Sequence, residues 1–489
     1  MSEQNQGNLP YQEFLSRLFP SLEQNTDSLA WQKNNEILLK KISQAQDAFL
    51  TQLKHNIDNK DTSLDPSAMD PFGLGKSFLE LTQKLMDDPE KLVNQQNAYW
   101  QNMWTLWQQT AQRMMPNQNV DDTEQSASSK PVAEPAAGDR RFKDEAWDEH
   151  AIFDFLKQSY LLSANYLQST IDAAEDLDPN TAKKLHFFTQ QFNDAVSPSN
   201  FWMTNPVVLK ETLESNGDNL VKGFDNLLSD FDSETGKLKI SMTDYNAFEV
   251  GKNLATTEGK VIFQNELMQL IQYSPLTEEV YKKPLLIIPP WINKFYILDL
   301  GEKKSFIRYA VEQGFTVFII SWVNPDESLR DYNFADYMLK GPLTALDVIE
   351  QATGEKNVNA IGYCIGGTLL SATLAYLGKK NDKRITHATF FTTLTDFSDA
   401  GELKIFTEEE QISHIEKVMA KQGYLDGSEM ALTFNMLRPN DLIWSFVVNN
   451  YLLGKQPFPF DLLYWNSDST RMPEKMHSYY LRNMYLENN

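Results

Sequence analysis

The chain has 489 residues, enough for about two to three domains of ordinary size, and 67 acidic against 44 basic residues give a net charge of −23. A chain this acidic is a poor general binder of nucleic acid, although the net charge does not forbid a local basic patch. The N-terminus has no basic and apolar leader pattern, and no run of about 18 apolar residues occurs, so we expect no signal peptide and no transmembrane span. The single cysteine, Cys364, excludes an intrachain disulfide.

Residues 1–119 are rich in Gln and Asn and show several helical patterns. Within them, Trp100, Met103, Trp104 and Trp107 recur at helical spacing and predict one apolar face with a polar back. Such a face either packs against another helix or remains at an interface, where it meets a hydrophobic particle or a partner. Tryptophan suits an interface because it combines an apolar ring with a polar N–H.

Residues 120–139 are poor in large apolar side chains and rich in Ser, Ala, Pro and acidic residues, which predicts a flexible linker. The pattern from 140 to 245 is again helical. Asn205 and Pro206 predict a helix start, with Asn205 as the cap and Pro206 in the first helical position.

From about residue 246 the pattern changes to alternating strands and helices, which predicts an α/β fold with a parallel sheet and helices on both faces. The expected strands are 237–242, just before this boundary, and 260–264, 284–290, 316–322, 358–361 and 385–394, and the expected helices are 304–313, 334–352 and 368–377.

The stretch around Cys364 predicts a strand, a tight turn and a helix. The apolar run Val358–Ile361 is followed by Gly362, Cys364, Gly366 and Gly367, which has the form of the nucleophile elbow G-x-S-x-G with cysteine in place of serine. The glycines allow a strained turn and close packing of the helix, whose dipole would favour a thiolate. The alternative is that Cys364 is only a small buried apolar residue.

An elbow of this kind indicates the α/β-hydrolase fold and acyl transfer. The first oxyanion donor would be the backbone N–H of Ile365, and the second would come from the loop 290–294, where Ile292 is the candidate. We expect this loop to continue as a helix that carries Asp299, either facing the site or acting as a structural helix or salt-bridge residue.

The base is harder to assign, because the expected chain order is nucleophile, acid, histidine. Only His387, His414 and His477 follow Cys364, and none is predicted on a loop after a late strand. Asp396 follows a strand end and could orient a base, although a turn-capping role is favoured. We therefore expect that the chain lacks the last part of its catalytic domain.

From about residue 140 to 489 the chain resembles the class I polyhydroxyalkanoate synthases. The resemblance rests on DRRFKDEAW, IIPPWINKFYILDL, IGYCIGG, LRPNDLIW and FDLLYWNSDST. It implies that an (R)-3-hydroxyacyl-CoA acylates Cys364, that repeated transfer lengthens a polyester, and that CoA is released. Asp299 and Arg438 fall in matching motifs and would shape the site, and residues 397–489 would form a cap over the cysteine.

The resemblance also implies a cytoplasmic homodimer at the surface of polyester granules, with no cofactor and no metal. It places the family's catalytic Asp and His beyond the cap, where this chain has ended. Two alternatives therefore stay open. The chain could be a truncated, inactive homologue that binds granules or a synthase partner, or it could be a hydrolase of the thioesterase or lipase kind.

Overall fold

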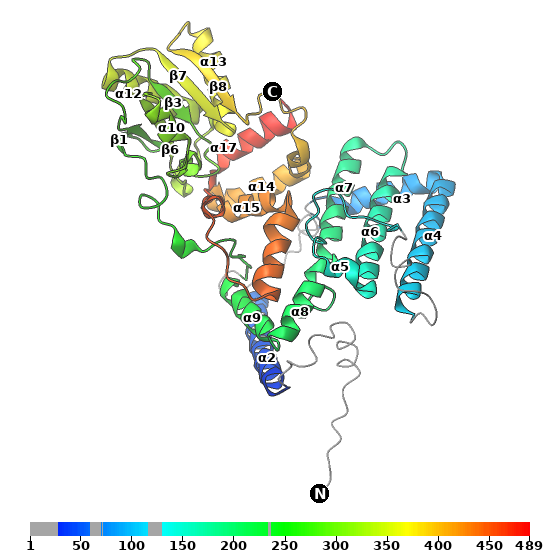
Figure 1. The fold of residues 1–489 in the computed structure, drawn as a ribbon. Helices are drawn as coiled ribbons and strands as arrows, with labels where there is room; N and C mark the ends of the chain where they lie inside the picture. Colours follow the sequence, from blue (N-terminus) through cyan, green and yellow to red (C-terminus); the bar gives the residue numbers. More distant parts are fainter. Residues whose placement is uncertain (1–27, 59–69, 71, 116–129, 233–235) are drawn as a thin grey trace. The chain divides into compact units, whose positions relative to one another are not determined.

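The computed structural model describes residues 28–58, 70, 72–115, 130–232 and 236–489 (Figure 1). The chain forms two compact units. The helical unit comprises the described parts of Met1–Leu64, Leu74–Ser241 and Arg438–Pro457, and the α/β unit comprises those of Asp65–Gly73, Met242–Leu437 and Phe458–Asn489. None of the described helices has both the length and the apolar character needed to cross a membrane.

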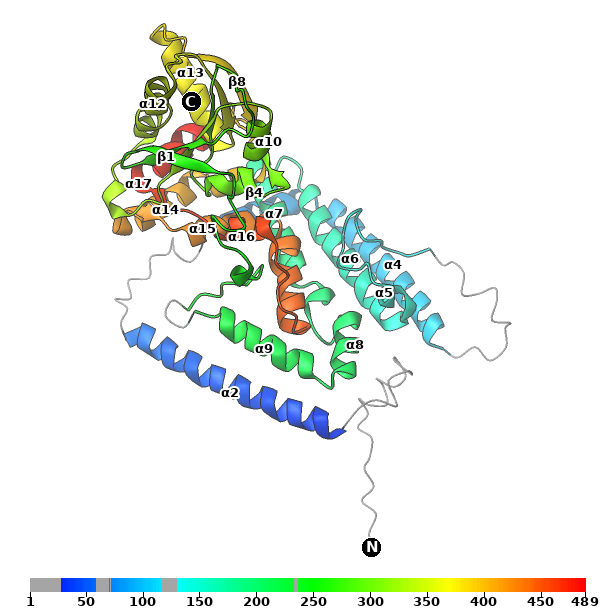
Figure 2. The ribbon, with the colours of Figure 1, turned by 60° about the vertical axis from the view of Figure 1, so that its left-hand side comes forward.

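The helical unit is built almost entirely of helices, as its sequence pattern predicts. Its apolar core contains Leu106, Trp147 and Phe153, each with at most 2% of its surface exposed. Helices α2 and α9 lie side by side in Figures 1 and 2. The elements are α2 (Ser28–Asp58), α3 (Leu74–Asp87), α4 (Pro89–Met114), α5 (Ala146–Glu149), α6 (Ala151–Asp172), α7 (Pro179–Ala195), α8 (Pro206–Glu214), α9 (Asp218–Asp230), η9 (Asn440–Trp444) and η10 (Val447–Leu452).

The predicted start of α8 is confirmed. The Asn205 side chain accepts hydrogen bonds from the amides of Val207 and Val208, and Pro206 occupies the first helical position. This cap satisfies two of the amides that have no partner within the helix.

The prediction of a flexible linker is wrong for its C-terminal half. Residues 120–129 lie outside the described residues, but Val132 and Ala133 are packed against α6. Their amides both donate to the side-chain oxygen of Gln158, and Ala133 is buried. Small side chains, which suggested flexibility, here allow the backbone to approach a buried amide group.

The tryptophan stripe of α4 is exposed rather than packed. Leu106 points into the core of the helical unit and Met103 packs against its edge. Trp100, Trp104 and Trp107, in contrast, are 59%, 58% and 53% exposed. Of the two interpretations of this face, the structure favours the interfacial one.

The α/β unit contains a mixed six-stranded sheet in the order β1-β2-β6-β3-β7-β8. Strands β6, β3, β7 and β8 are parallel, as predicted, but β2 runs antiparallel to both of its neighbours, β1 and β6. The reason is that only three residues join β1 to β2, too few for the crossover that a parallel pair requires. The bounds are β1 (Gly259–Gln264), β2 (Met268–Tyr273), β3 (Leu285–Ile288), β6 (Val317–Trp322), β7 (Val358–Tyr363) and β8 (Ile385–Phe391).

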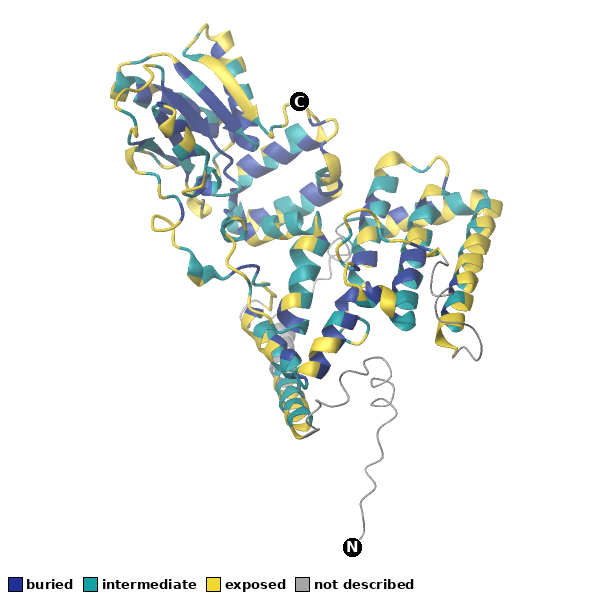
Figure 3. Ribbon diagram, in the orientation of Figure 1, coloured by how far each residue is buried: buried dark blue, intermediate teal, exposed yellow. Residues whose placement is uncertain are grey.

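Helices cover both faces of the central strands. Alternate residues of β3 point to opposite sides: Leu286 and Ile288 pack with α12 (Thr344–Thr353) and α13 (Ile365–Lys379), while Leu285 and Ile287 pack with α10 (Phe306–Glu312). The edge strand β8 differs, because five consecutive residues in it are exposed (Figure 3).

The predicted helix 334–352 is interrupted. It consists of α11 (Phe334–Met338), a π-helical turn, η7 (Leu339–Leu343), and α12. Pro342 lies inside the turn and lacks the amide proton that a regular helix would use there.

The segment expected to form a cap, residues 397–489, is mainly helical. Its middle part, Arg438–Pro457, belongs to the helical unit, and the remainder belongs to the α/β unit. The elements in the α/β unit are α14 (Glu409–Gln422), β9 (Tyr424–Leu425), α15 (Gly427–Met436), α16 (Asp461–Ser467), β10 (Met472–Pro473), α17 (Glu474–Tyr479) and η11 (Tyr480–Leu486).

A substitution at Gly223 tests how closely the segment Arg438–Pro457 packs against α9 in the helical unit. A Cβ at Gly223 would lie 1.9 Å from the carbonyl oxygen of Tyr451, a backbone atom that cannot easily move. We expect Gly223→Ala to destabilise this unit by about 1–3 kcal/mol, measured by urea unfolding. The matched control is Gly378→Ala, also in a helix but with open space around its Cβ, where we expect no loss. Equal unfolding midpoints for the two variants would contradict the packing.

Candidate functional site

The predicted strand, turn and helix around Cys364 are confirmed. Strand β7 ends at Tyr363, Cys364 has φ 54° and ψ −128°, and α13 begins at Ile365. A positive φ is strained for a residue with a Cβ, and nucleophile elbows have such a turn. The amide of Cys364 donates to the carbonyl of Phe391 at 2.9 Å, which fixes the turn to the end of β8.

The glycines of the elbow are required by close approach. A Cβ at Gly366 would lie 2.2 Å from the carbonyl oxygen of Ile288, and one at Gly362 would lie 2.4 Å from the Cα of Gly367. At Gly367 it would lie 2.0 Å from the hydroxyl of Thr393. A larger residue at Gly366 or Gly362 would push α13 away from β3 or β7, and one at Gly367 would displace Thr393, which follows β8.

The Cys364 side chain is partly buried, and α13 begins at the next residue, Ile365, whose backbone amide favours the thiolate. Burial raises the pKa of Cys364 because it disfavours the thiolate, and the Ile365 amide only partly offsets this. The expectation that the dipole of α13 favours a thiolate stays a prediction.

Tyr363, the neighbour of Cys364 in the chain, and two tyrosines far from it in the sequence, Tyr480 and Tyr485, lie near enough to the thiol to interact with its charge. Burial raises the pKa of Tyr363, Tyr480 and Tyr485, and the negative charge of a Cys364 thiolate would raise each further. The rings of Tyr480, Tyr485 and Phe397 pack edge to face, with centroids 5.0–6.1 Å apart. Neither Tyr480 nor Tyr485 was predicted to lie near Cys364, and the run SYYLRNMYL was the only signal for these two residues.

Ile292 lies in the loop that follows β3, beside the elbow. The loop begins at Pro289 and Pro290, which have no amide proton, so Trp291 and Ile292 carry its first backbone donors. In the part of the chain that the structure describes, the Ile292 amide donates no hydrogen bond. Its role as an oxyanion donor stays a prediction.

Asp299 does not lie on a helix, contrary to our expectation. After one 3₁₀ turn, η5 (Phe295–Leu298), it begins the short strand β4 (Asp299–Gly301). Its carboxylate is buried and accepts hydrogen bonds from the amide and hydroxyl of Thr257, at 3.2 and 2.7 Å. These contacts favour the structural interpretation of Asp299. Arg438 is an exposed residue of the helical unit, and a role for it in the site stays a prediction.

A catalytic histidine is expected on a loop that follows a late strand, and none of the three histidines after Cys364 lies on such a loop. His387 lies in β8 opposite Asn359, near the strand starts, whereas the elbow lies beyond the strand ends. His414 is in α14 and His477 is in α17. His477 is buried, and burial lowers its pKa to about 4. Among the described residues, no imidazole contributes to the pKa shift of Cys364.

Asp396 caps a turn, as favoured from the sequence. Its side chain accepts hydrogen bonds from the amide of Ser398 and from Asn488 Nδ2, at 2.9 and 3.0 Å. The Ser398 hydrogen bonds lower the pKa of Asp396 most strongly. Its carboxylate is thus already engaged.

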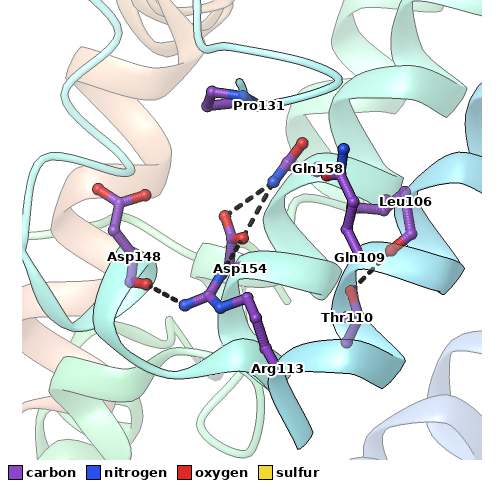
Figure 4. Close-up of a pocket in the computed structure, with 8 residues that line it drawn as sticks. All are labelled: Leu106, Gln109, Thr110, Arg113, Pro131, Asp148, Asp154 and Gln158. Atoms are coloured by element: carbon purple, nitrogen blue, oxygen red, sulfur yellow. Dashed lines mark hydrogen bonds and ion pairs between the residues drawn. The ribbon is translucent and has the colours of Figure 1, made fainter. Parts of the chain in front are cut away.

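The helical unit contains a cavity of about 290 Å³ whose charges are paired internally (Figure 4). Arg113 donates to Asp154 and to the carbonyl of Asp148, both at 2.6 Å, and Gln158 donates to Asp154. No cluster of three or more His, Cys, Asp or Glu side chains suited to a metal ion occurs among the described residues. The lining residues are Leu106, Gln109, Thr110, Arg113, Pro131, Asp148, Asp154 and Gln158.

Comparison with known proteins gives two family matches. Residues 138–310 match the family described as the N-terminus of poly-beta-hydroxybutyrate polymerase (PhaC), and residues 283–485 match the alpha/beta hydrolase fold. Among solved structures, a putative lipase from Sulfolobus solfataricus is 13% identical, with 45% of this chain and 79% of the lipase covered and a TM-score of 0.30.

Curated relatives are much more similar. The poly(3-hydroxyalkanoate) polymerase of Methylorubrum extorquens is 51% identical over 413 residues, which cover 84% of this chain and 67% of the relative. The polymerase subunit PhaC of Rhizobium meliloti is 48% identical, with 84% and 66% covered, and that of Cupriavidus necator is 40% identical, with 82% and 65% covered. The chain thus spans about two thirds of the length of these relatives.

The raised pKa of Cys364 predicts how its reactivity depends on pH. The thiolate is the reactive form, so we expect the rate of alkylation by iodoacetamide to rise with an apparent pKa above the ordinary value of about 8.5. Because Cys364 is the only cysteine, intact mass reports this reaction alone. Glutathione is the control thiol. A plateau of the rate at neutral pH would show an activated thiolate and contradict the buried, protonated thiol.

Proposed function

This chain belongs to the poly(3-hydroxyalkanoate) polymerase family, and we propose that it is an acyltransferase that polymerises (R)-3-hydroxyacyl-CoA with release of CoA. The observation that carries the proposal is the position of Cys364. The only thiol of the chain lies at a strained elbow, with the Ile365 amide at the adjoining start of α13. No cofactor is needed, because CoA is the leaving group of the substrate.

In the first step the Cys364 sulfur loses its proton and attacks the thioester carbonyl of the substrate. The amides of Ile365 and Ile292 would donate to the oxyanion that forms. The carbon–sulfur bond to CoA then breaks, and the CoA thiolate takes up a proton. One thioester replaces another, so the equilibrium constant of this step is close to one. Transfer of the acyl group to a hydroxyl is the favourable step that lengthens the polyester.

Removing the thiol proton is the difficult part of this step, because burial raises the pKa of Cys364. The family resemblance implies a histidine base oriented by an aspartate. His387, His414 and His477 occupy other places in the fold, so we propose that none of them is this base. Acylation of Cys364 in this chain should accordingly be slow at neutral pH and faster at higher pH.

The direct test is incubation of the chain with (R)-3-hydroxybutyryl-CoA. We expect release of CoA together with a hydroxybutyryl adduct on the protein, and both should fall to the uncatalysed level in Cys364→Ser. Free hydroxy acid without a lasting adduct would favour a thioesterase instead. An unmodified protein at every pH up to the thiolate range would contradict the acyltransferase.

We also propose that the tryptophan face of α4 (Trp100, Trp104 and Trp107) binds the surface of polyester granules in the cytoplasm. The three side chains are more than half exposed, and the rings of Trp104 and Trp107 stack with centroids 5.2 Å apart. Burying one such side chain at an apolar surface contributes about 1.5–3 kcal/mol. The family resemblance implies a homodimer, and we propose that the chain acts as one on the granule. The molar mass from light scattering would test this.

Changing Trp100, Trp104 and Trp107 together to Ser should lower the fraction of protein that sediments with polyester granules by about 10-fold, because apolar contact is lost. The control is Tyr309→Ser, which removes an aromatic residue of the α/β unit that is 58% exposed. Unchanged sedimentation of the triple variant, or an equal loss in the control, would contradict a specific role for this face.

A further inference from the structure

The segment 465–470 holds the loop that follows β3. Trp465 donates from its ring nitrogen to the carbonyl of Lys294 at 2.7 Å, and Tyr296 donates from its hydroxyl to Asp468 at 2.9 Å. Thr470 lies at the end of this segment and is 2% exposed. The segment belongs to the region expected to be a cap, yet its contacts are with the loop that carries the predicted second oxyanion donor.

Thr470 contacts the two peptide groups that matter most in this loop. Its hydroxyl is hydrogen-bonded to the carbonyl of Trp291 and lies 2.6 Å from that of Ile292. Its own amide donates to the Ile292 carbonyl at 3.2 Å. The Thr470 hydroxyl has one proton to donate. Because the Ile292 carbonyl already accepts from the Thr470 amide, we assign the hydroxyl proton to the carbonyl of Trp291.

The carbonyl of Trp291 and the amide N–H of Ile292 belong to the same peptide group. A peptide group is planar, and its C=O and N–H point in opposite directions. Any contact that fixes the Trp291 carbonyl therefore also fixes the direction of the Ile292 N–H. That N–H donates no hydrogen bond within the described chain, so it is available for a ligand.

The elbow lies against the start of the same loop. The Cα of Gly366 is so close to the carbonyls of Ile288 and Pro289 that a Cβ there would lie 2.2 and 2.6 Å from their oxygens. The loop is thus held from two sides, by α13 at its start and by Thr470 two and three residues further along.

We propose that Thr470 is a positioning residue that orients the Ile292 N–H as the second oxyanion donor. The inference rests on the proposed acyl transfer at Cys364. It adds that the cap segment 465–470 builds part of the oxyanion hole. Acyl transfer therefore requires this segment to be in place, whereas the reactivity of the Cys364 thiol toward an alkylating agent does not.

Two reactions of Cys364 separate these requirements. Acylation by p-nitrophenyl acetate forms an oxyanion, whereas alkylation by iodoacetamide does not. Loss of a whole oxyanion donor lowers the rate by about 10²–10³-fold. In Thr470→Val the Ile292 N–H would be present but wrongly oriented, so acylation should slow by about 10-fold or more. Thr470→Ser keeps the hydroxyl and should be acylated within about 2-fold of the unchanged chain. Alkylation should be equal in all three proteins.

Acylation of Thr470→Val at the unchanged rate would overturn the proposal. So would an equal loss in acylation and alkylation, because that would show a general structural role. Hydrogen exchange gives a second measurement: the loop 290–294 should exchange faster in Thr470→Val, and unchanged exchange would also overturn the proposal.

The test also separates this proposal from the proposed function. If the unchanged chain accepts an acyl group from p-nitrophenyl acetate but not from (R)-3-hydroxybutyryl-CoA, the substrate assignment fails, and the comparison of the Thr470 variants still decides the positioning role. A chain that is alkylated but accepts an acyl group from neither donor overturns both.

Discussion

The site depends on one close backbone contact, that of Gly366 with the carbonyls of Ile288 and Pro289. It joins the first turn of α13 to the end of β3 with no side chain between them. The strained dihedrals of Cys364, which cost on the order of 1–3 kcal/mol, are held by this packing and by the Cys364 amide bound to Phe391. The same contact brings the loop 290–294 beside the elbow, so a thiol and a possible oxyanion donor come together through one constraint.

Burial gives this site its chemical character. The thiol is partly buried at the elbow, and this burial raises its pKa because it disfavours the thiolate. Tyr480 and Tyr485 cannot remove the proton, because burial raises their pKa values too. They remain neutral, and their rings pack on each other edge to face. Placement of the nucleophile and its activation are therefore separate properties. The described residues position the thiol, but none of them is assigned as the base that would activate it.

Local sequence patterns predicted the parts of the structure that local physics decides. The elbow was predictable because its glycines and Cys364 are adjacent in the chain, and the α8 start because Asn205 and Pro206 act on their own helix. Asp299 was misplaced because a single 3₁₀ turn resembles the start of a longer helix. Strand β2 was missed because two glutamines interrupt its apolar residues, so neither a continuous apolar run nor a strict alternation marks it.

Contacts over long sequence distances could not be predicted. Tyr480 and Tyr485 are more than a hundred residues from Cys364, and Thr470 reaches Trp291 across 179 positions. Nothing in the stretch FDLLYWNSDST indicates which backbone group its threonine will hold. Such contacts come from the tertiary fold, and here they account for most of what surrounds the elbow.

If the proposed acyl transfer is right, Cys364 becomes a thioester of the substrate acyl group. Peptide mapping by mass spectrometry, after brief reaction with (R)-3-hydroxybutyryl-CoA and an acid quench, locates the acyl group. We expect a hydroxybutyryl group on the one peptide that contains cysteine, and neutral hydroxylamine should remove it, as it does from a thioester. Turnover of the substrate with that peptide unmodified, or with the acyl group on another residue, would contradict it.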